Sequence, residues 1–223
     1  MDHNKISNKV LFEKRWPVGL TIIIVTFLLW QIPERLSLLP GWTLYVVCIS
    51  MLIPFAAIGI SKANPLWINI EKYVLLFFLT LIGIGNLFNL HNLVSDMLYK
   101  SSEISGLQLL ASSISVWINN ILMFSLLYWQ IDRGGPEARL NSRDKKPDWY
   151  FSEESAPDKF ISKNWNPVFV DYLFLGFSTS TAFSATDTLP LTPKAKLLMM
   201  IQSLISLTII VIVGARAINI LGS

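Results

Sequence analysis

The side chains that could bind a ligand or an ion lie close together in one short segment, residues 172–186. This segment has no charged residue, and six of its 15 residues are Ser or Thr. They are Ser178, Thr179, Ser180, Thr181, Ser184 and Thr186. As a helix, the segment would be about 22 Å long, which is too short for the ~30 Å hydrocarbon core of a bilayer. A lipid-facing helix would not carry so many hydroxyls, because each one needs a hydrogen-bond partner.

We therefore predict a half-crossing helix followed by irregular backbone. Irregular backbone at membrane depth persists only where protein buries it or where it lines a watery cavity. Two other interpretations stay open. The segment is a packed hairpin, since Ser and Thr allow helices to approach closely, or it is a tilted sixth span.

The rest of the sequence offers no constellation for catalysis or metal binding. His3 and His91 are far apart, and neither has a Cys or carboxylate cluster beside it. The single cysteine, Cys48, lies in an apolar run. Gly134-Gly135 lacks the following Lys-Ser/Thr of a phosphate-binding loop and predicts a turn. We therefore expect no enzyme activity, no catalytic residue, no metal site and no cofactor.

Composition indicates an integral membrane protein. Of 223 residues, 52% are hydrophobic and 15% are charged, whereas soluble domains carry about 25% charged residues. Residues 36–61, 73–95 and 104–131 contain no Asp, Glu, Lys or Arg. Each run is long enough to cross a bilayer as a helix, which takes about 20 residues. The net charge of +3 is too small to indicate a nucleic-acid partner.

The predicted fold is all-α, a polytopic membrane protein with about five transmembrane helices and a re-entrant half helix. Four spans are expected first, and a fifth closes the sequence. They cover residues 17–33, 42–61, 73–91, 107–130 and 197–221. The connectors between the first four spans are expected at residues 34–40, 62–72 and 92–106. The basic N-terminal residues lead into a first span that is retained, because no small-x-small cleavage site follows it.

The sequence divides into a four-span region (1–131), an extramembrane loop (132–165) and a hairpin with the last helix (166–223). Within the loop, Trp149-Tyr150-Phe151 is a candidate for anchoring the loop to the bilayer surface. Four of its seven acidic residues are interpreted as part of a solvated surface: Asp148, Glu153, Glu154 and Asp158.

The start of the half helix is predicted at Asn166-Pro167. Asn is a favoured N-cap residue, and Pro is tolerated in the first turn because its missing N–H has no intrahelical partner there. Asp171 would then lie early in the helix, where a negative charge suits the helix dipole.

Residues 171–192 resemble the pore helix and filter loop of potassium channels. Asp187, Pro190 and Thr192 match the Asp, Pro and Thr that follow the family's filter, and Thr181 matches a threonine before it. The sequence also resembles a group of bacterial membrane proteins of about this length, in which four spans precede a similar loop. The resemblance implies a cation pore in a bacterial cell membrane. It also implies monovalent cations and the lipid bilayer as partners, and a homo-oligomer of four chains.

The filter itself departs from the family. In place of T-V-G-Y-G the sequence has Ala182-Phe183-Ser184-Ala185-Thr186. The potassium filter replaces the ion's water shell with backbone carbonyls, and its glycines permit backbone conformations that other residues resist. The hydroxyls of Ser184 and Thr186 would instead line a wider or gated pore. The candidate site is therefore Thr181, Ala182, Phe183, Ser184, Ala185, Thr186 and Asp187.

Two questions stay open at this point. The first is function: a cation pore without a voltage sensor, or a non-conducting scaffold, sensor or accessory subunit that kept the hairpin.

The second is the orientation of the protein in the membrane. Residues 1–16, 62–72 and 131–165 carry 13 Lys and Arg, against two in the opposite connectors, which places the first set in the cytoplasm. A channel-like hairpin that enters from outside requires the reverse.

Overall fold

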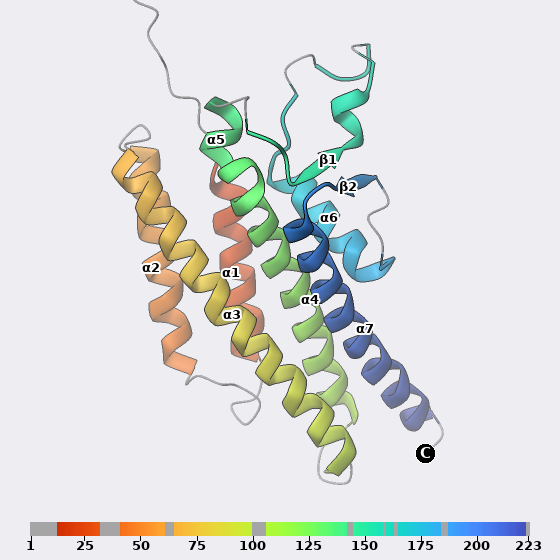
Figure 1. Cartoon of the computed structure of the whole chain (residues 1–223). Coiled ribbons are helices and arrows are strands. Elements are labelled where there is room, and N and C mark those ends of the chain that lie inside the picture. The colour runs from red at the N-terminus through yellow and green to blue at the C-terminus, as the bar shows by residue number, and fades with distance from the viewer. Residues whose placement is uncertain are drawn as a thin grey trace, which may run out of the picture.

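The protein folds as a bundle of helices, as expected for the all-α class (Figure 1). The computed structural model describes residues 13–31, 41–60, 65–99, 106–141, 145–157, 159–162, 165–183 and 187–221. The helices are α1 (Trp16–Gln31), α2 (Gly41–Ile60), α3 (Pro65–Tyr99), α4 (Gly106–Ile131), α5 (Pro136–Asn141), α6 (Phe169–Thr181) and α7 (Pro193–Leu221), with the 3-10 turns η2 (Asp132–Gly134) and η3 (Ser152–Ser155). Two short strands, β1 (Trp149–Phe151) and β2 (Thr188–Pro190), pair antiparallel.

Helix α4 is the centre of the bundle. It packs against α1, α3, α6 and α7, while α2 lies on α1 and α3. Its aromatic residues Phe124, Tyr128 and Trp129 are buried in the core. Among the residues that the structure describes, three helical stretches are long and apolar enough to cross a membrane: Leu66–Ser95, Leu110–Asn141 and Pro193–Ala215. These three stretches are compatible with a membrane protein.

Helix α3 is longer than the sequence predicted, at both ends. It covers 65–99 rather than 73–91, so parts of the expected connectors 62–72 and 92–106 are helical. The charged residue Glu71, which suggested a connector, is buried because Arg15 pairs with it. The Arg15 Nε to Glu71 Oε1 distance is 2.9 Å.

The described residues between 132 and 165 lie at one end of the bundle, which we call the loop end (Figure 1). This part of the chain begins with a tight turn in which Gly134 and Gly135 have φ values of +85° and +111°, as the predicted turn requires. The C-terminus lies at the opposite end of the bundle (Figure 1).

The prediction that Trp149-Tyr150-Phe151 anchors the loop to the bilayer surface is wrong. These residues form β1, and the side chains of Trp149 and Phe151 are buried. Trp149 packs on Tyr128 of α4 with ring centroids 4.7 Å apart.

The expectation of a solvated Asp148 is also wrong, because Asp148 is buried and accepts a hydrogen bond from Lys194 Nζ at 2.8 Å. Asp158 lies outside the described residues.

Candidate functional site

The candidate site is a hairpin made of α6, the residues after it, and β2. It lies against α4 and α7, and β2 returns the chain to β1 at the loop end (Figure 1). Helix α6 has 13 residues, or about 20 Å. This segment therefore starts and finishes at the same end of the bundle.

Helix α6 begins two residues later than predicted. Asn166 does not cap it. Instead, Asp171 Oδ2 accepts the Val168 backbone N–H at 2.7 Å. Burial raises the pKa of the Asp171 carboxyl above its ordinary value, and this hydrogen bond opposes the rise. Asp171 does lie early in the helix, as the sequence predicted.

Two acidic residues from other elements fix the start of α6 at the loop end. Glu13 Oε1 accepts the Phe169 backbone N–H at 2.9 Å. The buried hydroxyl of Tyr172 donates to Asp132 Oδ2 at 2.5 Å. Because Glu13 precedes α1 and Asp132 follows α4, two segments that are distant in sequence hold this helix end.

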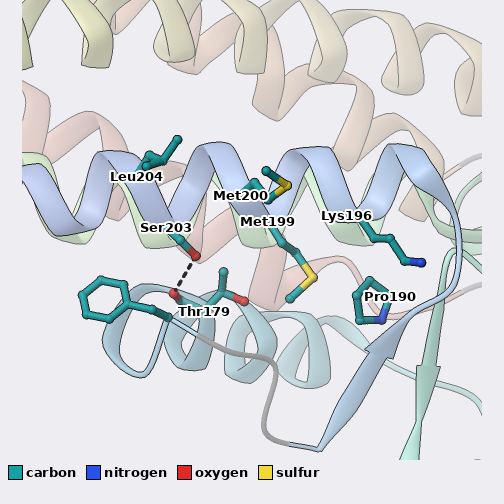
Figure 2. A pocket seen from close by; sticks show the side chains of 8 residues that line it. Thr179, Pro190, Lys196, Met199, Met200, Ser203 and Leu204 are labelled. Atoms are coloured by element: carbon teal, nitrogen blue, oxygen red, sulfur yellow. Dashed lines mark hydrogen bonds between the residues drawn. The ribbon is translucent and has the colours of Figure 1, made fainter.

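The far end of α6 reaches well into the bundle. Ser203 Oγ donates to the carbonyl oxygen of Thr179 at 3.3 Å (Figure 2). Ser203 is ten residues beyond the start of α7, which is about 15 Å along that helix. Since α7 has 29 residues, or about 43 Å, α6 ends roughly a third of the way along it.

A buried polar network joins α6 to α7 and α4. Gln202 of α7, which is fully buried, is its centre. Gln202 Nε2 donates to the carbonyl oxygen of Gly176 and to Ser180 Oγ, both at 2.8 Å. Gln202 Oε1 accepts the Tyr128 hydroxyl at 2.6 Å. The network thus fixes the depth and rotation of α6 relative to both neighbours.

The network continues one turn further along α7. Asn120 Nδ2 of α4 donates to Ser206 Oγ at 2.9 Å and to the Gln202 carbonyl oxygen at 3.3 Å. Gln202, Asn120 and Tyr128 were not among the site residues predicted from the sequence. They could have been found as polar side chains inside apolar runs, because such side chains usually face the protein interior.

The tip of the hairpin holds the first part of the predicted filter-like site. Thr181, Ala182 and Phe183 are exposed there. The Thr181 hydroxyl donates back to the Phe177 carbonyl oxygen at 2.9 Å. Phe183 has φ +53°, a left-handed conformation that costs a residue with a Cβ about 1–2 kcal/mol.

The remaining predicted residues fall into two groups. Ser184, Ala185 and Thr186 lie outside the described residues. Asp187 is exposed and lies just before β2, where its carbonyl oxygen accepts the Ser152 N–H at 3.2 Å. The structure therefore places Asp187 beside the end of β1 at the loop end, rather than beside Gln202.

The other two motif residues have structural roles after the hairpin. Pro190 pairs with Trp149 in the sheet. Thr192 caps α7, because its Oγ1 accepts the Ala195 N–H at 3.2 Å and donates to Asp148 Oδ1 at 2.7 Å. Pro193 follows in the first helical position, which Pro favours. These contacts fix the start of α7 to the loop.

A pocket of about 660 Å³ lies between the tip of the hairpin and α7 (Figure 2). It is lined by Thr179, Phe183, Pro190, Lys196, Met199, Met200, Ser203 and Leu204. The walls are apolar, apart from the Thr179 and Ser203 side chains and the Lys196 amine. Among the residues that the structure describes, no group of three His, Cys, Asp or Glu side chains is placed to hold a metal ion.

No protein-family model matches this chain, and no curated protein or solved structure does either.

Proposed function

We propose that the protein is a potassium-channel-like cation pore with an altered filter and no voltage sensor. The observation that carries this proposal is the hairpin. A 13-residue helix enters the bundle at the loop end, stops part of the way in, and is followed by a strand that returns to the same end. With α1, α2, α3, α4 and α7 as transmembrane helices, the hairpin would be a re-entrant element within a five-span protein.

The position of the tip supports a watery surrounding. Backbone outside helices is tolerated at membrane depth only in protein or beside water. The exposed Thr181 and Ala182 stand at the end of α6, about 15 Å inside the bundle by the Thr179–Ser203 contact. In lipid their open backbone groups would lack partners, so a solvated path or a neighbouring chain should cover them.

The direction of α6 favours cations. A helix carries a partial negative charge at its C-terminus, and the C-terminus of α6 is the tip. Hydroxyl and carbonyl oxygens follow it in residues 181–186. These are the groups that replace an ion's water shell in cation filters. The proposal therefore names monovalent cations as the permeating class.

We expect weak discrimination between potassium and sodium. The family's two filter glycines are replaced by Ser184 and Thr186, following the aligned order 182–186. Residues with a Cβ resist the conformations that a glycine filter uses. Hydroxyl groups on the wider loop would then take part in ion contact.

A pore of this kind requires several chains, because each chain supplies a single hairpin. The face of α6 away from the core is apolar, with Val170, Phe174 and Phe177 about half exposed. Next to it, a groove of about 530 Å³ runs between α6 and α4. These surfaces suit contact with another copy, and the resemblance implies four.

A second function is favoured by the firm attachment of α6. The network around Gln202 fixes the helix to α4 and α7, and both filter glycines are absent. These features suit a non-conducting scaffold, sensor or accessory subunit in which the hairpin only supports the fold.

Reconstitution into liposomes separates the two functions. Purified oligomer should carry potassium and sodium at comparable rates, with little chloride flux. Protein-free liposomes and liposomes holding an unrelated helical membrane protein are the controls. Absence of cation flux from protein that is demonstrably folded and oligomeric would favour the scaffold.

A further inference from the structure

The elements at the loop end are joined by buried ion pairs. Arg15, just before α1, pairs with Glu71 near the start of α3 and with Glu137 of α5. Arg139 of α5 contacts Glu13 Oε2 at 3.3 Å and the Trp129 carbonyl oxygen at 2.6 Å. These contacts place the starts of α1 and α3, the end of α4, and α5 at one end of the bundle.

The open side of the hairpin lies at this same end. Glu13 also binds the first backbone N–H of α6, and β2 pairs with β1. Asp148, beside β1, binds Lys194 at the start of α7. The entrance and the exit of the hairpin therefore share an end with the N-terminal segment and with the loop 132–165.

The basic residues are concentrated at this end. Of the Lys and Arg in the described part of the chain, ten lie at the loop end, and Arg216, close to the C-terminal end of α7, lies at the other. The ten are Lys14, Arg15, Lys72, Arg133, Arg139, Lys145, Lys146, Lys159, Lys194 and Lys196. In multi-span proteins, short segments rich in Lys and Arg stay in the cytoplasm.

We propose that the loop end faces the cytoplasm, so that cations reach the tip of the hairpin from the cytoplasmic side. This inference rests on the proposed function in treating the chain as membrane-spanning. It is opposite to the orientation of a hairpin that enters from outside. The reason is physical: the contacts fix the hairpin to the loop end, and the basic residues fix the loop end to the cytoplasm.

The proposal also assigns the side of the remaining elements. Helices α3 and α7 run away from the loop end, so their C-terminal ends would lie outside the cell (Figure 1). Helix α4 runs toward the loop end, so its N-terminal end would lie outside as well. The Asp187 carboxyl group and the Lys194–Asp148 pair would line the cytoplasmic approach to the hairpin.

Cysteine labelling in membranes tests the orientation. In a Cys48→Ser background, one variant carries Lys159→Cys at the loop end and another carries Leu107→Cys at the opposite end. Both positions are exposed in the structure. A membrane-impermeant maleimide should label Lys159→Cys in inside-out vesicles and spare it in right-side-out vesicles. Leu107→Cys should show the reverse pattern, and both variants should label fully in detergent.

The opposite pattern would overturn the proposal, and so would equal labelling of either variant from both sides of sealed vesicles. This measurement does not depend on conduction. A correct labelling pattern with no ion flux would reject the pore and keep the orientation. Protein recovered outside the membrane fraction would reject membrane insertion itself.

Discussion

Gly176 of α6 lies directly against Ser125 of α4. A Cβ added at Gly176 would stand 2.2 Å from Ser125 Oγ and 3.2 Å from the Ile121 carbonyl oxygen. Only a residue without a side chain allows the two helices to come this close. Because the carbonyl oxygen belongs to the backbone of α4, it cannot turn aside as the hydroxyl can.

Gly176→Val should therefore destabilise the protein. Overpacking in a tight core costs about 1–3 kcal/mol. Thermal unfolding in detergent, followed by tryptophan fluorescence, should show a lower Tm. The matched control is Gly85→Val in α3, where an added Cβ meets nothing within 4 Å. Equal Tm values for the two variants would contradict the close contact between α4 and α6.

Gln202→Leu should also lower the Tm, because it leaves the buried Tyr128 hydroxyl without its acceptor and removes the donor that binds Ser180 Oγ. Leaving buried polar groups unpaired costs about 1–3 kcal/mol each. Thr208→Leu, on an exposed face of α7, is the control. Adding Tyr128→Phe to Gln202→Leu should cost less than the sum of the single changes. If the destabilisation of the double variant equals the sum for the two single variants, the two side chains do not interact.

Arg15→Gln should be among the most destabilising single changes at the loop end. It leaves the buried carboxylate of Glu71 and the partly buried carboxylate of Glu137 without their cation, and breaking a buried pair costs about 3–5 kcal/mol. Lys14→Gln, at the exposed neighbouring position, should have little effect. Comparison of the two unfolding curves checks this prediction, and similar curves would contradict a buried role for Arg15.

Asn119→Leu should raise the Tm. Asn119 is fully buried in α4, and both polar atoms of its carboxamide lack a hydrogen-bond partner among the described residues. An apolar side chain of similar volume removes a cost of about 1–3 kcal/mol. Asn69→Leu, on an exposed part of α3, serves as the control. A lower Tm for Asn119→Leu would show that water or a solute binds this amide.

The helices with long uncharged runs could be predicted from sequence. α1, α2 and α4 begin and end within two residues of the expected spans, because each is a long, mostly apolar run without Asp, Glu, Lys or Arg. α3 could not be bounded in the same way. Its charged residue Glu71 pairs with Arg15, 56 positions away, and no local pattern reports such a partner.

The candidate site could be predicted in part. The unusual hydroxyl content located the segment that contains α6. The start of α6 was missed because the N-cap position is Val168, whose N–H Asp171 accepts, instead of Asn166. The buried strand pair of Trp149–Phe151 with Thr188–Pro190 was missed as well. Its two halves are nearly 40 positions apart, and strands of three residues give a weak signal.

The orientation conflict had the same origin. The number of basic residues in each connector can be read from the sequence, but which connectors share an end with the hairpin cannot. The contacts of Glu13 with Phe169 and of Asp148 with Lys194 supply that information.

The most direct test of the pore is cation flux through a variant that blocks the tip of the hairpin. Ala182 is exposed at the end of α6, so Ala182→Trp adds bulk without entering the core. In liposomes, this variant should lose most of the potassium flux, while Leu107→Trp at the opposite end of α4 should keep it. Both variants must first match the parent protein in Tm and oligomeric state. Equal flux from the two variants, or no flux from the parent protein, would contradict a conducting path along the hairpin.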